Sequence, residues 1–346
     1  MKFYLILSVI FTYLNADIRT QVIMGTYVTI NVKKYHNSAF ERMKEVDLAL
    51  SSYNKDAEIF KLNSKRELDL TPLAIKSLNY AKEIYTLTDG YFQVAIGNIT
   101  KDLYRFGEDE RVATKDELKN ASVGWNLVQI DNNHVKLLNS VKLDFGGIGK
   151  GIAVDSAASK LDYLGVKEGS ISASGDIKCL GLCKIDITNP FTKEIFTTFQ
   201  TLKPNLAVST SGNYRRYVKK KENNHLINPK SKTPEQIFAS VTLVSFKSNA
   251  YVDALSTAIA VMPLKKALSF LKEHHELGYL LITTDNSVYF GNLDSFVTHN
   301  VAYDKKNGDN KKSLENQKTY PLNYGENAKI SYEKISTSHI SHKAYK

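Results

Sequence analysis

Hydrophobic residues alternate with polar residues over short stretches of the chain and recur at helical spacing over longer ones. Alternation between residues 19 and 32, interrupted at Met24-Gly25-Thr26, predicts two strands joined by a turn. We therefore expect many short, hairpin-like strands, of which the others lie in segments 125–143, 170–188, 191–210 and 241–246.

Longer segments carry apolar residues at the spacing of one helix face. Ser38 and Glu41 form a candidate capping box before the first predicted helix, and Thr71-Pro72 supplies an N-cap and a first residue for the second. Gly165 and Pro263 mark the ends of a third and a fourth helix. Because helices and strands alternate irregularly, the pattern predicts an α+β or mixed α/β fold.

The N-terminus combines a basic start, Met1-Lys2, with an apolar run over residues 3–14 and a small residue, Ala16. This pattern is typical of a secretory signal peptide, and the run is shorter than the ~20 residues that span a bilayer. The alternative is a buried N-terminal helix or strand. No Cys follows the run, which argues against a lipoprotein anchor. We expect cleavage after Ala16 and a mature protein in a bacterial periplasm.

Composition and charge narrow the class of protein. The 346 residues include 42% hydrophobic and 24% charged residues, which excludes a disordered chain, a collagen-like repeat and a multi-span membrane protein. The net charge of +10 indicates an anionic partner, whether nucleotide, nucleic acid or membrane surface. After Phe296 the chain becomes polar. We expect a signal peptide over 1–16, one catalytic domain over 17–296 and a flexible, non-catalytic tail over 297–346.

Two cysteines, Cys179 and Cys183, flank Leu180-Gly181-Leu182, which we interpret as the tip of a tight hairpin. Residues on either side of such a tip face each other closely enough for a disulfide, and an oxidising compartment permits one. Two half-buried free thiols explain the spacing equally well, so both alternatives stay open.

A glycine-rich segment, residues 143–151, joins a predicted strand to a predicted helix and carries Lys150. Glycines let backbone N–H groups approach an anion, and the helix N-terminus and the lysine add positive charge, so a phosphate is the natural ligand. The Walker pattern requires Ser or Thr after Gly-Lys, but Gly151 follows here, and the dinucleotide spacing is absent. The alternative is a tight strand-to-helix turn without a ligand.

Two further segments carry candidate chemistry. Asp253 and Thr257 are four residues apart on the fourth predicted helix, so their oxygens share one side with Ser256 beside them, a set that suits Mg²⁺. The alternative role of Asp253 is to complement the helix dipole. His225 precedes Leu-Ile-Asn-Pro, and a lone histidine near a turn also fits a surface or core position.

The order of these blocks along the chain resembles the ApbE-type FAD:protein FMN transferases, or flavin transferases. The resemblance runs from about residue 20 to residue 296 and implies a single catalytic unit of antiparallel-leaning sheets with packed helices. The blocks are Met-Gly-Thr at 24–26, Ser-Tyr at 52–53 followed by Asp56 and Glu58, Thr-Asp-Gly-Tyr-Phe at 88–92, the Gly-rich segment, Ser-Gly-Asp at 174–176, Thr-Ser-Gly-Asn-Tyr-Arg at 210–215, His-Leu-Ile-Asn-Pro at 225–229 and Asp-Ala-Leu-Ser-Thr at 253–257.

The resemblance implies Mg²⁺ as cofactor, FAD as substrate, and transfer of FMN to a Ser or Thr hydroxyl of a partner redox protein with release of AMP. It implies that His225 is the general base. It further implies that the flavin and nucleotide contacts are Met24, Tyr53, Tyr91, Phe92, Gln93, Asp144, Lys150 and Ile227, and that Mg²⁺ is held by the Gly147 carbonyl with Asp253, Ser256 and Thr257.

The chain departs from the family pattern at several positions. Gln93 and Asn228 stand where family members often carry Asp, and Gly149 stands where they often carry Ala. Ser172-Ala173-Ser174-Gly175-Asp176 replaces Asn-Ala-Gly-Gly-Asp. Gln93 and Asn228 keep hydrogen-bonding capacity but lose charge, which bears on FAD affinity more than on the reaction.

Two alternatives share this site. One is an FAD pyrophosphatase that releases FMN and AMP, and the other is a non-catalytic periplasmic flavin carrier. Retention of Asp253, Thr257 and His225 argues against a carrier, because storage needs no metal-assisted leaving group. We expect FAD and an acceptor flavoprotein subunit as partners, no nucleic acid, and proximity to the inner membrane surface.

Overall fold

The computed structural model describes residues 17–214, 216–299, 318–322 and 328–332. Its centre is a 10-stranded sheet of β1 (Asp17–Ile23), β2 (Thr26–Val32), β6 (Ser170–Ala173), β7 (Asp176–Cys179), β10 (Leu206–Gly212), β13 (Phe238–Ser245), β14 (Gly278–Thr283), β15 (Ser287–Gly291), β18 (Ala328–Tyr332) and β17 (Lys318–Leu322), in that spatial order. Neighbouring strands are antiparallel except β15 and β18, which are parallel. The sheet therefore brings segments far apart in sequence side by side.

Smaller sheets flank the central one. A 3-stranded sheet has the order β16 (Val297–His299), β9 (Ile195–Thr201) and β8 (Lys184–Thr188). A second has the order β3 (Glu67–Asp69), β5 (His134–Leu137) and β4 (Val128–Asp131), and β11 (Ile227–Asn228) pairs with β12 (Thr233–Pro234).

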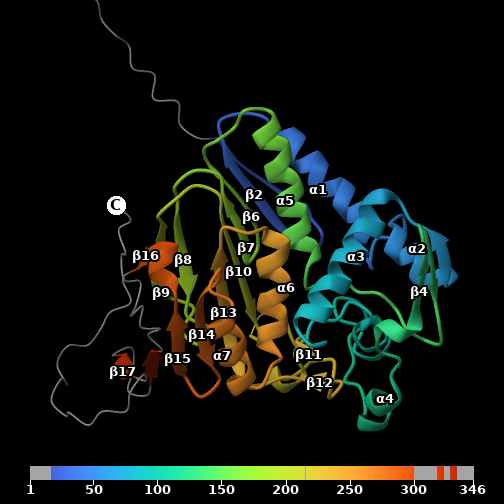
Figure 1. Ribbon diagram of the computed structural model, residues 1–346. Helices are drawn as coiled ribbons and strands as arrows, with labels where there is room; N and C mark the ends of the chain where they lie inside the picture. The colour runs from blue at the N-terminus through green and yellow to red at the C-terminus, as the bar shows by residue number, and fades with distance from the viewer. Residues whose placement is uncertain (1–16, 215, 300–317, 323–327, 333–346) are drawn as a thin grey trace, which may run out of the picture.

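The helices gather on one side of the central sheet, whereas β8, β9 and β16 cover the other (Figure 1). This arrangement gives two cores, a large one between sheet and helices and a smaller one under β8 and β9. The helices are α1 (His36–Leu50), α2 (Glu58–Lys65), α3 (Pro72–Leu87), α4 (Lys115–Asn120), α5 (Gly149–Tyr163), α6 (Asn249–Ala260) and α7 (Leu264–Glu273), with the π-helix η1 (Asn98–Leu103) and short 3₁₀ turns η2 (Trp125–Leu127), η3 (Lys221–Asn223) and η4 (Leu293–Ser295).

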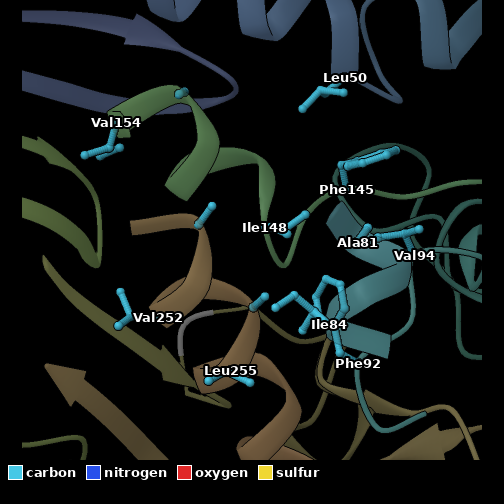
Figure 2. Close-up of a cluster of buried hydrophobic side chains, with 14 of the residues drawn as sticks. Leu50, Ala81, Ile84, Phe92, Val94, Phe145, Ile148, Val154, Val252 and Leu255 are labelled. Carbon is cyan, nitrogen blue, oxygen red and sulfur yellow. The ribbon is translucent and has the colours of Figure 1, made fainter. Parts of the chain in front are cut away.

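The large core fixes the start of α5 against α6. Figure 2 shows Ile148, just before α5, in one apolar cluster with Leu255 of α6 and Phe92, which follows α3. Each of these side chains is at most 2% exposed. Burying such a side chain contributes roughly 1.5–3 kcal/mol. The glycine-rich segment is therefore held at a defined place beside α6.

The predicted fold class is confirmed, and so are most of the predicted elements. The turn between β1 and β2 falls at Met24 and Gly25, both at positive φ. Thr71 caps α3 by accepting a hydrogen bond from the Ala74 N–H, with Pro72 as the first helical residue. These signals are local in sequence, which is why they could be read without the tertiary structure.

Two local predictions were wrong, and the helices α2, α4 and α7 were not predicted. The helix α1 begins at His36, ahead of Ser38, so the predicted capping box does not form, and Tyr35 at its N-cap gives no side-chain bond. Pro263 does end α6, but it also precedes α7, which was not predicted. Cys179 and Cys183 do not flank a hairpin, because β7 and β8 belong to different sheets. They do form a disulfide, which links the two sheets.

The predicted signal peptide, residues 1–16, lies outside the described residues. The division at residue 296 stays a prediction; the described chain beyond it supplies β16, β17 and β18. Within the described ranges, no helix has the length and apolar character needed to cross a bilayer.

Candidate active site

The glycine-rich segment docks the start of α5 onto the start of α6. A Cβ on Gly151 would lie 2.6 Å from the Asn249 carbonyl oxygen and 2.7 Å from the Ala250 nitrogen, so a side chain does not fit there. At this close approach the Gly151 N–H donates to Asp253 Oδ2 at 2.9 Å. The glycine that departs from the Walker pattern therefore serves a contact between two helices.

Two carboxylates and one ammonium group form the centre of the site. Lys150 Nζ lies 2.9 Å from Asp176 Oδ2 and 3.4 Å from Asp253 Oδ1. Both carboxylates are buried, and the Ser209 hydroxyl donates to Asp176 Oδ1 at 2.6 Å. Sequence reasoning placed Lys150 and Asp253 at the site but did not assign a role to Asp176, which begins β7 in the Ser-Gly-Asp segment.

The charges in this cluster shift one another's pKa values. Burial and then the neighbouring Asp176 raise the pKa of Asp253 above its usual range. Burial by itself would lower the pKa of Lys150, but the charges of Asp176 and Asp253 outweigh it and raise that pKa above its usual value. The ammonium therefore stays charged at neutral pH and offsets part of the negative charge of the pair.

The chemistry of the surrounding donors fits a hard cation. The Thr257 hydroxyl lies 3.5 Å from the Gly147 carbonyl oxygen, and a Cβ on Gly147 would come within 2.9 Å of Thr257 Cγ2. Carboxylate, carbonyl and hydroxyl oxygens are the ligands that Mg²⁺ prefers, usually with one or two carboxylates and substrate phosphates. No group of three or more His, Cys, Asp or Glu that could hold a metal occurs among the described residues. Asp253, Thr257 and the Gly147 carbonyl suit Mg²⁺ bound together with a phosphate.

Ser256 shares one neighbour with Thr257, since the Ser211 hydroxyl lies 3.4 Å from that of Thr257, but it has further contacts of its own. Its hydroxyl lies 2.8 Å from that of Ser211 and 3.1 Å from that of Ser209, both on β10, and it donates to the Asp253 carbonyl. These contacts hold α6 against β10 beneath the carboxylates. A role for Ser256 as a metal ligand stays a prediction.

His225 is oriented by the main chain. Its Nδ1 lies 3.1 Å from the Arg216 carbonyl oxygen and must donate to it, which leaves Nε2 as the acceptor. Burial, with smaller contributions from the charges of Arg216 and Lys150, lowers the pKa of His225 to about 4. The ring is therefore neutral at physiological pH, as a general base requires.

Tyr53 has a crowded, charged surrounding. Its hydroxyl donates to the Phe106 carbonyl oxygen and accepts from Arg216, each at 2.8 Å. Burial, followed by the charge of Asp144, raises its pKa to about 12. Lys101 Nζ lies 2.9 Å from the centre of the Tyr53 ring, and neither this lysine nor Arg216 was singled out from the sequence.

Asp144 and Tyr91, two further residues predicted to contact the flavin or nucleotide, have polar or charged partners. Asp144 accepts from the Thr100 hydroxyl at 2.6 Å and from the Gly146 N–H at 3.0 Å. The Tyr91 ring lies under two lysine ammonium groups, those of Lys230 and Lys266.

Met24, Phe92, Gln93 and Ile227 have structural partners. Met24 packs near Gly149, where a Cβ would lie 3.1 Å from its Cε. Phe92 belongs to the large core and Ile227 to a small separate cluster. Gln93 Oε1 accepts from the Ala95 N–H at 2.9 Å. The structure thus brings Asp253, Lys150 and Thr257 together with Gly147, and the flavin contacts of Phe92, Gln93 and Ile227 stay predictions.

The chain is similar to known proteins over most of its length. The ApbE family profile matches residues 24–281, well over half of the chain. A FAD:protein FMN transferase of Haemophilus influenzae is 29% identical over 284 residues, covering 75% of this chain and 81% of that protein. One of Vibrio cholerae is 26% identical over 263 residues, covering 70% and 78%.

Two solved structures share the fold. An ApbE protein from Thermotoga maritima superimposes with a TM-score of 0.74 at 23% identity, covering 81% of this chain and 98% of that one. The flavin transferase ApbE from Vibrio cholerae gives 0.71 at 23% identity, covering 82% and 99%. Taken with the family match over residues 24–281, these likenesses mean that the chain belongs to the ApbE family.

Proposed function

We propose that this protein is a Mg²⁺-dependent FAD:protein FMN transferase that attaches FMN to a Ser or Thr hydroxyl of a partner redox protein. Curated relatives that match most of its length are named FAD:protein FMN transferase, which supports transfer of FMN from FAD to a protein. The observation that carries the proposal is the meeting of Lys150, Asp253 and Thr257 beside the Gly147 carbonyl, a set suited to a cation and a pyrophosphate together.

The reaction breaks the phosphoanhydride bond of FAD and forms a phosphoester bond to the acceptor. The acceptor hydroxyl oxygen bonds to the phosphorus of the FMN half, the bond from that phosphorus to the bridging oxygen breaks, and AMP leaves with the bridging oxygen. His225 Nε2 takes the hydroxyl proton, since its Nδ1 is already committed to the Arg216 carbonyl. Lys150 offers a charge to the pyrophosphate oxygens while it is held between Asp176 and Asp253.

Asp253, Thr257 and the Gly147 carbonyl would hold Mg²⁺. When bound, the cation would supply charge neutralisation on the pyrophosphate oxygens and help to orient them. The residues themselves fix the place of this chemistry, because Gly151 and Gly147 lock α5 and its preceding turn against α6.

One incubation tests the proposal. The purified protein is mixed with FAD, Mg²⁺ and an acceptor flavoprotein domain that carries a Ser or Thr at its flavinylation site. We expect covalent FMN on the acceptor, seen as a mass increase and in-gel flavin fluorescence, together with AMP in solution. A matched acceptor with Ala in place of the hydroxyl residue should stay unmodified. FMN and AMP released without modified acceptor would indicate a pyrophosphatase, and intact FAD would indicate a carrier.

We further propose that the mature protein acts in a periplasm, at the surface of the inner membrane. The apolar run over residues 3–14 and Ala16 support export, and the net charge of +10 supports attraction to an anionic membrane. Mass spectrometry of the protein from fractionated cells should find a mature N-terminus at Asp17 in the periplasmic fraction. An intact Met1 in the cytoplasmic fraction would contradict the proposal.

A further inference from the structure

Lys101 is a buried ammonium group without a hydrogen-bond partner among the described residues. It lies on the π-helix η1, and its side chain is 7% exposed. The nearest carboxylate oxygen, Asp144 Oδ2, is 3.9 Å from Nζ, too far for a hydrogen bond. A buried charge in this state is costly unless another group completes its contacts.

The groups around Lys101 form a recognisable pattern. Its Nζ lies 2.9 Å from the centre of the Tyr53 ring, and Arg216 Cζ lies 5.8 Å from the same centre. Asp144 is the carboxylate beside the two cations, and its charge raises the pKa of Tyr53 while Arg216 lowers it. The Lys101 ammonium therefore covers one face of the Tyr53 ring, with a second hydrogen-bond donor, Arg216, and an acceptor, Asp144, nearby.

A purely structural role explains this arrangement poorly. The contact with Tyr53 offsets part of the cost of burying the charge, as cation–π contacts do. It leaves all three ammonium hydrogens without an acceptor, and Asp144 already accepts from Thr100 and Gly146. π-Helical turns also occur frequently at functional sites, because they displace a side chain from its regular helical position. The Lys101 ammonium is therefore able to donate hydrogen bonds to acceptor atoms of a ligand.

The pattern matches one end of FAD better than the other. The outer edge of the isoalloxazine ring presents a carbonyl, an N–H and a second carbonyl in sequence, which calls for a donor, an acceptor and a donor. The adenine edge presents one amino donor beside one ring acceptor. We propose that Lys101, with Asp144 and Arg216, recognises the imide edge of the isoalloxazine ring and so selects for flavin; this inference rests on the proposed function.

Binding measurements on the folded full-length protein test this inference. Wild type, Lys101→Gln and Lys101→Arg are titrated with riboflavin, FAD and ADP, followed by flavin fluorescence or calorimetry. Lys142→Gln is the matched control, because Lys142 pairs with Asp102 of the same π-helix and its side chain is 31% exposed. Lys101→Gln should weaken riboflavin and FAD about tenfold or more, since a lost hydrogen bond to a charged donor costs at least that. ADP affinity should not change, Lys101→Arg should retain most of the flavin affinity, and Lys142→Gln should match wild type.

Each other outcome has a definite meaning. If Lys101→Gln binds riboflavin as tightly as wild type, or if it weakens the binding of ADP and not that of riboflavin, the inference is overturned but the proposed function stays intact. Failure of wild type to bind FAD overturns the proposed function itself.

A second measurement needs no variant. Infrared difference spectra of riboflavin bound to wild type should show its imide carbonyl stretches at lower frequency than in water, because charged donors weaken the C=O bonds. Carbonyl bands at the frequencies of free riboflavin would overturn the inference even if Lys101→Gln failed to fold.

The pH dependence gives a third readout. Burial lowers the pKa of Lys101 to about 8, against the opposing charge of Asp144 and with a further lowering by Arg216. Riboflavin affinity of wild type should therefore fall as the pH rises through about 8, and Lys101→Gln should show no such fall. The neighbouring Tyr53 does not titrate in this range, because its pKa is raised to about 12. A pH-independent affinity in wild type would contradict the role of the ammonium.

Discussion

The buried carboxylate of Asp253 has several roles at once. Its carboxylate accepts from the Gly151 N–H, pairs with Lys150 and lies near a second carboxylate, Asp176. It therefore contributes to helix docking, to charge balance and, in the proposed function, to binding a cation. A substitution that preserves its shape separates these roles.

Asp253→Asn should lower the rate of FMN transfer about 100-fold or more, because the amide keeps an acceptor for Gly151 but loses the charge that attracts a cation. The measurement is the rate of transfer as a function of Mg²⁺ concentration, which should show a requirement for more Mg²⁺. The control is Asp186→Asn, whose carboxylate on β8 accepts from the Thr198 hydroxyl. A wild-type rate in Asp253→Asn would remove this residue from the proposed metal site.

His225 should make folding stability depend on pH. Its pKa is about 4 in the folded protein but near 6.5 when exposed. Between these values the unfolded chain binds the proton more readily, so the free energy of unfolding should decrease as the pH falls from about 6.5 towards 4. Urea denaturation at pH 7.5, 5.5 and 4.5 measures this decrease, which should be smaller in His225→Gln. Equal pH dependence in the two proteins would show that His225 is not buried in its neutral form.

At the scale of elements, the decisive feature is the close approach of α5 and α6. Nothing in the sequence near Gly151 reveals it, because the partner backbone at Asn249 and Ala250 lies far along the chain. Signals contained within one element, such as Thr71-Pro72 at the start of α3, could be read directly. The burial of Lys101 and the position of Arg216 could not, since both arise only when distant segments pack together.

The sheet that each cysteine-bearing segment joins could not be predicted from the sequence either. Alternation identifies β7 and β8 as strands but does not say which sheet each one joins, and the hairpin interpretation failed for that reason. By contrast, the grouping of Asp253 and Thr257 on one helix face depends only on helical spacing and could be anticipated. The pairing of Asp253 with Lys150 could be seen only in the tertiary fold.

Gly151→Ala should destabilise the protein by roughly 1–3 kcal/mol, because the added methyl group would press on the backbone of α6. Transfer should fall with it, since α5 must move away from Asp253 to relieve the overlap. Thermal unfolding and the transfer assay together measure both effects. Ser159→Ala, an exposed change on the same helix, is the control; if Gly151→Ala is as stable as this control, the close approach is not as tight as described.

The disulfide between Cys179 and Cys183 should contribute about 2 kcal/mol, the value expected for closing so short a loop. Thermal unfolding of the double variant Cys179→Ser with Cys183→Ser should therefore show a lower midpoint than wild type. A reducing agent should lower the midpoint of wild type but not that of the variant. Equal midpoints for oxidised and reduced wild type would contradict the contribution.

For the whole molecule, the central sheet separates the site from the far edge. The site lies where α5 and α6 meet β7 and β10, whereas β15 follows β13 and β14 towards the other edge (Figure 1). The strands β17 and β18 extend that edge, with β18 parallel to β15. Substitutions at this edge should therefore lower the stability of the fold and leave the transfer rate nearly unchanged.

Removal of residues 301–346 should leave the transfer rate within about twofold of wild type, because β17 and β18, the described part of this segment, pair at the edge of the sheet far from the site. The same truncation should lower the unfolding midpoint, since it uncovers the edge of β15. Steady-state rates and thermal unfolding of the truncated protein check the two parts. A tenfold loss of rate in a folded truncated protein would assign a catalytic role to the C-terminal segment.

The lysine between Asp176 and Asp253 has a consequence for how the protein matures. Two carboxylates packed this closely would repel each other in an empty site, but the Lys150 ammonium balances them from within the chain. The polypeptide can therefore reach its native shape before it encounters any metal ion. An enzyme of this design would fold first and bind its ion afterwards, with Lys150 still between the two carboxylates.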